Sequence, residues 1–185
     1  MPDLAGPKIA YLGYCGLIDS AGVTRIAQAI NAAVNQQYDR VHLCFTSNGG
    51  YVGDGMFLYH HIRSLPVPLT LHNTGTVASI AATLFVAAEK RLCSPNAIFM
   101  IHPVAVGTQA QSLSSAPLVA ALQAALADEE RTDAILRDRT KMPAEVLDTR
   151  RKSNIYITAK QALEYGLVHE IGEFSLPAGN QIFQI

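Results

Sequence analysis

Residues 74–82 read TGTVASIAA, a stretch in which a predicted strand gives way to a predicted helix. The strand covers residues 69–71, Gly75 interrupts the pattern, and residues 77–88 are apolar almost all round, as in a buried helix. Ser79 is the hydroxyl at this transition. Backbone N–H groups in the first turn of a helix have no intrahelical partner, so they can stabilise negative charge on a substrate oxygen beside a nucleophilic serine.

A second interpretation of Ser79 requires no chemistry. A serine among alanines also lets two helices pack closely, and one short motif is weak evidence for catalysis. The stretch by itself leaves both interpretations open, and the rest of the chain must decide between them.

Length and composition narrow the class of protein. The 185 residues are enough for one domain with a sizeable core and too few for two domains of typical size. Hydrophobic residues make up 49% of the chain, charged residues 16%, and the net charge is -1. This balance gives no electrostatic basis for binding nucleic acid or an anionic membrane surface. The small charged fraction indicates that self-association covers part of the surface.

The amino terminus and the cysteines bear on the compartment. Residues 1–7 lack the basic start and apolar core of a signal peptide, and no apolar run is long enough to span a bilayer. We therefore expect a cytoplasmic protein that does not enter a membrane. The cysteines are odd in number and lack paired metal-ligand spacing, which predicts reduced core residues. They are Cys15, Cys44 and Cys93.

Strands and helices alternate in the first half of the chain. Strands are predicted over residues 8–14 and 40–46, and helices over about 20–37 and 52–63. This rhythm is typical of right-handed βαβ units around a parallel sheet, so the fold class is α/β.

The second half contains the longest predicted helix, over about residues 116–139. Strands are predicted over residues 91–93 and 98–101, and residues 104–112 alternate like an exposed strand. In so small a domain the long helix either projects onto another subunit or folds back on its own core. Shorter elements follow over about residues 143–152, 155–157, 158–166 and 168–171, and residues 173–185 form a loosely held tail.

Three chemically suggestive features lie at successive strand ends. Gly49 and Gly50 follow one strand, Ser79 follows the next, and His102 follows a third. In an open parallel sheet these carboxyl ends gather at one edge, where sites form. Together the residues support a serine nucleophile with a histidine base about as well as they support purely structural roles.

Other candidate sites are weaker. The glycines lack the spacing of a phosphate loop or a dinucleotide motif, so we expect no nucleotide cofactor. His60 and His61 are adjacent on a helix and point in different directions, so they make a poor metal pair. The acidic residues 128–130 are interpreted as a solvated helix face. No cofactor or metal is expected.

Four motifs, in order along the chain, resemble those of ClpP, the proteolytic-subunit family of the Clp serine protease. They are SNGGYV at residues 47–52, VASIA at 77–81, CSPN at 93–96 with MIH at 100–102, and ALEYGLV at 162–168. The resemblance extends from about residue 8 to residue 171.

The resemblance implies the ClpP/crotonase fold of stacked βα units, with a protruding strand and helix, the handle, at about residues 104–141. It places the peptidase domain at residues 8–172, between an extended or disordered start at 1–7 and a tail at 173–185. The handle of this family interlocks two rings, so the resemblance implies homo-oligomeric rings and favours a projecting long helix.

The resemblance also implies a site. Ser79 would be the nucleophile and His102 the general base, with the backbone N–H groups of Gly50 and Ile80 as the oxyanion hole. The implied reaction is hydrolysis of peptide bonds in short or unfolded polypeptides.

The chain departs from the family pattern in three places. Counting back from residues 165–167, the family's triad aspartate falls on Asn154, which can orient an imidazole but carries no charge; Asp148 is the alternative third member. Asn48 replaces a proline before the two glycines. The segment that in the family lines the axial pore and engages the ATPase is absent before residue 8, which argues against docking of a Clp ATPase.

Two further functions compete with the peptidase. A catalytically weak or silent ClpP-like scaffold subunit is favoured by Asn154, whereas Ser79, His102 and the glycines favour the enzyme. Crotonase-type acyl-CoA chemistry on the shared fold is less favoured, because the serine and the histidine would then have no reason to coincide.

Overall fold

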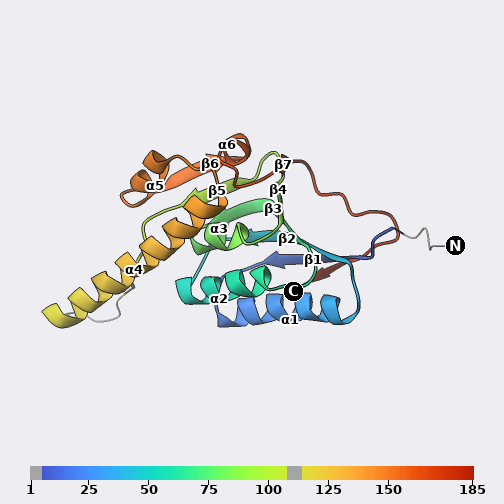
Figure 1. The fold of residues 1–185 in the computed structure, drawn as a ribbon, viewed down its shortest axis with the longest axis horizontal. Helices are drawn as coiled ribbons and strands as arrows, with labels where there is room; N and C mark the ends of the chain where they lie inside the picture. Colours follow the sequence, from blue (N-terminus) through green and yellow to red (C-terminus); the bar gives the residue numbers. More distant parts are fainter. Residues whose placement is uncertain (1–5, 108–113) are drawn as a thin grey trace.

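The computed structural model describes residues 6–107 and 114–185, and within these ranges it forms one eight-stranded sheet and six helices (Figure 1). The strands of the main path lie in the order β6-β5-β3-β2-β1-β8, while β4 pairs with both β3 and β7. The predicted α/β class with βα units is therefore confirmed.

Three parallel strands form the centre of the sheet. They are β1 (Ile9–Cys15), β2 (Arg40–Ser47) and β3 (Leu69–Ala78). Their register aligns Leu12, Leu43 and Leu71 across the three strands, and all three side chains are buried. This row of leucines belongs to the core that the helices cover.

The first three helices follow the first three strands and lie on one side of the sheet (Figure 1). They are α1 (Ser20–Asn35), α2 (Val52–Arg63) and α3 (Ile80–Phe85). The α1 helix begins where the Asp19 carboxylate accepts the backbone N–H of Gly22 at 2.7 Å, as an N-cap. Its buried residues recur every three or four positions, which explains why periodicity predicted it.

The long strand β3 has two partners on the same edge. Its first part, from Thr70 to Asn73, pairs with β4 (Lys90–Cys93), and its last part, from Thr76 to Ala78, pairs with β5 (Ile98–Ile101). The end of β5 is thereby brought level with the end of β3. This arrangement decides where the residues after each strand meet.

The remaining elements surround β5. The strand β6 (Ile155–Thr158) pairs with it in antiparallel fashion, and β7 (Glu170–Ile171) pairs with β4. Two short helices, α5 (Ala144–Arg150) and α6 (Ala159–Glu164), flank β6 along the chain. A capping box between Thr158 and Gln161 begins α6.

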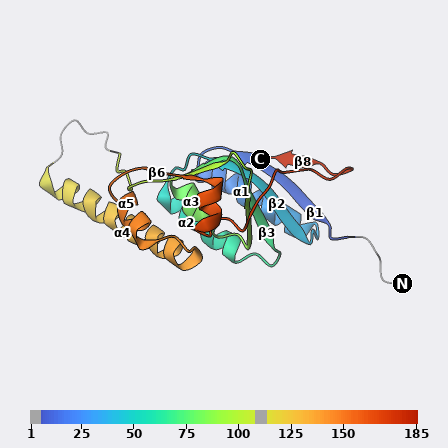
Figure 2. The ribbon, with the colours of Figure 1, turned by 90° about the horizontal axis from the view of Figure 1, so that it is seen from above.

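The long helix α4 (Ser115–Arg139) projects from the body of the molecule in both views (Figures 1 and 2). Its carboxyl-terminal part is anchored, because Leu136 is fully buried. Its first part exposes leucines that are more than half accessible, and so it does not fold back on its own core. The predicted exposed strand at 104–112 lies partly outside the described residues, and residues 104–107 contain no strand.

Two further predictions differ from the structure. The strand before Ser79 spans ten residues, Leu69–Ala78, rather than three, because β3 must reach both β4 and β5. The tail is tied to the sheet rather than loosely held: β8 (Ile182–Gln184) pairs with β1, and the N–H of Ile185 donates to Gly13 O at 2.9 Å. This pairing satisfies backbone N–H and C=O groups at the edge of β1 that would otherwise have no partner.

The cysteines also depart from prediction in one case. Cys44 and Cys93 are buried, and burial raises the pKa of each thiol to about 11. Cys15 is exposed at the end of β1, so it is not a core residue. In the described parts of the chain no helix is both long and apolar enough to cross a membrane.

Candidate active site

Ser79 forms the turn between β3 and α3. Its backbone has φ 59° and ψ −133°, a region that non-glycine residues rarely adopt. The turn is held because the N–H of Ser79 donates to Met100 O at 2.7 Å. Such strain persists only where the surroundings impose it, and it concentrates at functional positions.

His102 follows the last residue of β5 and lies directly against the serine. The parallel register places Met100 beside Ala78, so the residues that follow the two strands come together. The distance from His102 Nε2 to Ser79 Oγ is 2.8 Å. This is the reach that proton transfer between a serine and a base requires.

The loop after β2 approaches Ser79 through glycines. Gly49 has φ 95°, and a Cβ on it would lie 2.6 Å from the Cβ of Ser79. A Cβ on Gly50 would lie 2.1 Å from Ile18 O. Only glycine allows the backbone to pass this close at both positions.

The backbone N–H groups of Gly50 and Ile80 flank the serine. Within residues 6–107 and 114–185, neither of these N–H groups has a hydrogen-bond partner. Gly50, Ser79, Ile80 and His102 all line one small pocket with a volume of about 90 Å³. The structure thus brings together four of the predicted site residues.

Neither candidate for the third member makes a hydrogen bond to the histidine in the described ranges. β5 pairs with β6 so that Ile101 lies opposite Ile155, and extending this register by one residue places Asn154 opposite His102. Asp148 lies on α5, and both residues are exposed. In the described ranges, the ring of His102 makes one hydrogen bond, the one to Ser79, and none to Asn154 or Asp148.

Two residues that sequence reasoning missed also line the pocket, Thr132 from α4 and Arg150 from α5. Both side chains are buried, and Arg150 Nη2 donates to Thr132 Oγ1 at 2.8 Å. No motif marks them. The signal in the sequence was only an arginine in a short helix beside a family-like motif, which is too common to be informative.

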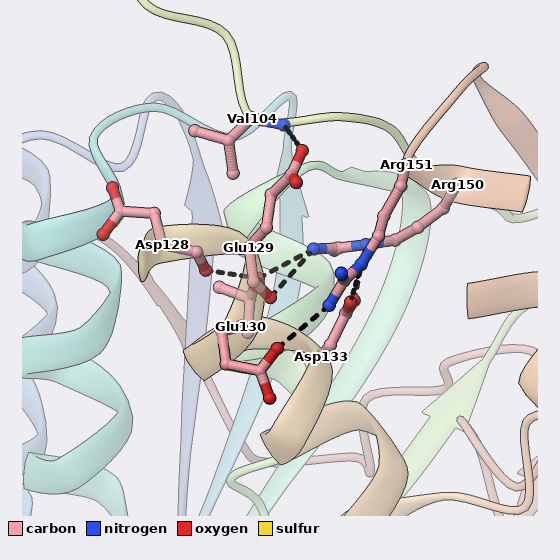
Figure 3. A network of polar contacts seen from close by, with 8 residues as sticks. Val104, Asp128, Glu129, Glu130, Asp133, Arg150 and Arg151 are labelled. Atoms are coloured by element: carbon pink, nitrogen blue, oxygen red, sulfur yellow. Dashed lines mark hydrogen bonds and ion pairs between the residues drawn. The ribbon is translucent and has the colours of Figure 1, made fainter. Parts of the chain in front are cut away.

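A polar network fixes these residues (Figure 3). Asp133 lies between two guanidinium groups, at 2.7 Å from Arg150 Nε and 2.6 Å from Arg151 Nε. The first approach is a charge contact without hydrogen-bond geometry, and the second is a hydrogen bond. Burial lowers the pKa of Arg150, an effect that Asp133 opposes, whereas the hydrogen bond that Arg151 donates to Asp133 raises the pKa of Arg151.

The acidic residues of α4 take part in this network. Glu130 pairs with Arg151 at 3.1 Å, and Glu129 Oε1 accepts the N–H of Val104 at 3.2 Å (Figure 3). Asp128 pairs with Arg131 at 2.7 Å on the helix itself. The predicted solvated face is therefore partly wrong, because Glu129 ties α4 to the loop after His102.

Within the described ranges no group of three or more His, Cys, Asp or Glu side chains is arranged to hold a metal ion. His60 and His61 lie in the last turns of α2. His60 packs edge-on against Tyr59, and His61 stacks on Phe57. These contacts give both histidines a packing role.

Comparison with known proteins gives a consistent assignment. The family model for Clp protease matches residues 14–175. The ATP-dependent Clp protease proteolytic subunit 2 of Pseudomonas aeruginosa is 24% identical over 166 residues, which span 89% of this chain and 81% of that protein. The ATP-dependent Clp protease proteolytic subunit 3 of Rhizobium etli is 25% identical over 158 residues, which span 84% of this chain and 80% of that protein.

Proposed function

The chain belongs to the Clp protease family, and from this premise we propose that it is a serine endopeptidase that cleaves short or unfolded polypeptides. The observation that carries the proposal is the 2.8 Å contact between Ser79 Oγ and His102 Nε2, in a pocket that the N–H groups of Gly50 and Ile80 also flank. A nucleophile, a base and two unpartnered donors are the parts that acyl transfer needs.

The proposed reaction has two stages. Ser79 Oγ attacks the peptide carbonyl while His102 Nε2 takes its proton, and the N–H groups of Gly50 and Ile80 donate to the resulting oxyanion. The C–N bond then breaks as the protonated His102 gives the proton to the departing amine. Water hydrolyses the acyl-enzyme by the same sequence of proton transfers.

The imidazole needs a partner that fixes its tautomer. We propose that Asn154 supplies it, with its side-chain oxygen accepting the Nδ1–H of His102, because the β5–β6 register places it opposite the histidine. Asp148 is the alternative partner. An asparagine fixes the tautomer but adds no charge to stabilise the imidazolium, so we expect slow turnover.

Assembly belongs to the same proposal. We propose that residues 8–172 are the peptidase domain and that α4, within the handle at about 104–141, packs on a second copy in homo-oligomeric rings. The exposed leucines of its first part support this. The names of the two relatives include ATP dependence, so an ATPase partner is a further candidate for this chain.

A second candidate function is a ClpP-like subunit without activity. One observation favours it: no hydrogen bond joins His102 to Asn154 or Asp148 in the described ranges. Without a partner for its second ring nitrogen, the histidine would serve the serine poorly.

One experiment separates the two candidates. The full chain is incubated with a fluorophosphonate probe at neutral pH, since the probe reacts only with an activated serine. We expect labelling of the wild-type protein and none of Ser79→Ala, together with loss of peptide hydrolysis in that variant. An assembled wild-type sample that stays unlabelled would favour the inactive subunit, and hydrolysis that survives Ser79→Ala would place the chemistry elsewhere.

A further inference from the structure

The pocket beside Ser79 has a polar wall that the proposed reaction does not use. Thr132 and Arg150, which line it, are 3% and 4% exposed. Figure 3 shows the Arg150 side chain extending from the end of α5 to α4. A buried threonine and guanidinium beside a candidate nucleophile constrain what the pocket can accept.

The hydrogen bonds of these two side chains leave one lone pair of Thr132 and the Nη1 group of Arg150 free. Thr132 Oγ1 accepts from Arg150 Nη2 at 2.8 Å and shares its own proton between Asp128 O at 2.8 Å and Glu129 O at 3.1 Å. Its oxygen keeps one lone pair. Arg150 Nε faces Asp133, whereas Nη1 has no hydrogen-bond partner among the described residues.

The charges around Arg150 are net negative. Arg150 and Arg151 face Asp133 between them, Glu130 pairs with Arg151, and Glu129 lies close enough to Arg150 to raise its pKa. Two cations thus meet three carboxylates. A further carboxylate in the pocket would gain no net attraction, so the free guanidinium donor suits an uncharged acceptor.

The pocket is large enough for a short side chain. About 90 Å³ is several times the roughly 10–15 Å³ that one water molecule needs. The carboxamide group of asparagine or glutamine therefore fits in it.

We propose that this pocket binds the side chain of the residue that supplies the scissile carbonyl, and that it selects a carboxamide, asparagine or glutamine. The carboxamide oxygen accepts from Arg150 Nη1, and its NH₂ group donates to Thr132 Oγ1. The inference rests on the proposed peptidase function and names the substrate class of that site.

An apolar occupant is disfavoured for a specific reason. It would shield the free Arg150 donor from water without replacing its hydrogen bond, and a buried charged donor without a partner is costly. Sites that hydrogen-bond a substrate group discriminate strongly against analogues that lack it. We expect about tenfold or greater preference for asparagine over leucine.

The test uses the full chain and fluorogenic peptides that differ only in the residue before the leaving group: Asn, Gln, Asp or Leu. The expected order of kcat/KM places Asn and Gln about tenfold or more above Leu, with Asp below Asn. Fluorophosphonate labelling of Ser79 is measured on the same samples. Labelled protein that prefers Leu, or Asp over Asn, overturns the carboxamide assignment alone, whereas unlabelled protein overturns the proposed function on which it rests.

Variants assign the preference to the pocket wall. Thr132→Val keeps the shape but removes the free lone pair, so the Asn-to-Leu ratio should fall about tenfold, while Thr132→Ser should retain it. Thr149→Val is the matched control, because Thr149 is an exposed residue of α5 whose hydroxyl also donates to a backbone carbonyl, that of Glu145. The Asn-to-Leu ratio of Thr149→Val should equal that of the wild type. An unchanged ratio in a folded Thr132→Val protein would overturn the role of Thr132.

A measurement on the wild-type chain covers the case in which Thr132→Val does not fold. Peptides ending in Asn or Leu at the cleaved position are added before the fluorophosphonate probe, and the labelling rate of Ser79 is followed. The Asn peptide should protect at about tenfold lower concentration. Equal protection, or better protection by the Leu peptide, would contradict the proposal.

Discussion

Ser79 is held in its unusual conformation by its neighbours rather than by its own preference. An L-residue at φ 59° and ψ −133° carries strain on the order of 1–3 kcal/mol. The bond from its N–H to Met100 O and the close passage of Gly49 stabilise the turn. The strain leaves Oγ facing the ring of His102, which is the geometry that the proposed nucleophile requires.

In the described ranges the ring of His102 makes a hydrogen bond to Ser79 alone. The variant Asn154→Asp tests whether residue 154 serves as the partner of its second ring nitrogen. A carboxylate opposite the ring would fix the tautomer and stabilise the imidazolium that forms during attack. We expect peptide hydrolysis at least equal to that of the wild type, and up to several orders of magnitude faster if Asn154 is the third member. The measurement is kcat/KM on one fluorogenic peptide.

Asp148→Asn serves as the comparison, because it removes the alternative acid without changing side-chain size. If Asp148 completes the site, this variant loses most of its activity while Asn154→Asp changes little. If Asn154 completes the site instead, the Asp148→Asn variant should hydrolyse the peptide at a rate close to that of the wild type.

At the scale of the element, α4 presents an apolar stripe that has no partner within the described chain. Leu118, Leu122 and Leu126 are spaced four residues apart and are 51%, 59% and 52% exposed. Residues at this spacing lie on one face of a helix. The stripe is what a projecting helix would bury against a second copy.

Leu122→Asp is therefore expected to weaken self-association. Burying a leucine contributes about 1.5–3 kcal/mol, and an unpaired carboxylate in its place adds a desolvation cost. The assembly should dissociate at a protein concentration about tenfold or more higher than for the wild type, as measured by sedimentation velocity over a dilution series. Gln123→Asp is the matched control, since it adds the same charge at the next, exposed position. Equal sedimentation of both variants and the wild type would contradict a role for the stripe.

At the scale of the whole molecule, an aromatic cluster joins the sheet to the segment after β7. The ring centroid of Phe174 lies 5.1 Å from that of His42 and 6.0 Å from that of His72, and the two histidine rings are 5.5 Å apart. His42 Nε2 and His72 Nδ1 are enclosed without hydrogen-bond partners in the described part of the chain. Burial lowers the pKa of His42 to about 4 and also lowers the pKa of His72.

The lowered pKa of each histidine predicts that the folded state loses stability as the pH decreases. The folded-state pKa of His42 lies below the unfolded value of about 6.5, so the unfolded chain binds the proton more readily. The contribution of His42 is fully present above pH 6.5 and is lost as the pH falls toward 4. Between pH 7.5 and pH 5 we expect a loss of about 2 kcal/mol in the free energy of unfolding from His42, with a further loss from His72.

Urea unfolding at the two pH values measures this loss. His42→Phe should reduce the pH dependence by roughly the His42 share, whereas the exposed His60 offers a control in which His60→Gln leaves it unchanged. A wild-type protein that is equally stable at both pH values would contradict the prediction.

Local chemistry explains how much the sequence alone determined. Short segments of the sequence encode several features of the fold and the site. They are the apolar periodicity of α1, the glycines after β2, and the positions of Ser79 and His102 at strand ends. Parallel strands gather their carboxyl ends at one edge, so a serine and a histidine at two such ends were predicted to be neighbours. The α/β class and the family resemblance followed from the same local patterns.

The tertiary structure alone decided how distant segments align. Local periodicity carries no information on which strand meets which, so the division of β3 between β4 and β5 and the pairing of β8 with β1 could not be predicted. The polar wall of the pocket could not be predicted either, because Thr132 and Arg150 come from two helices that only packing brings together. The sequence thus placed a candidate nucleophile beside a candidate base, while the packing of α4 and α5 determined the pocket next to them.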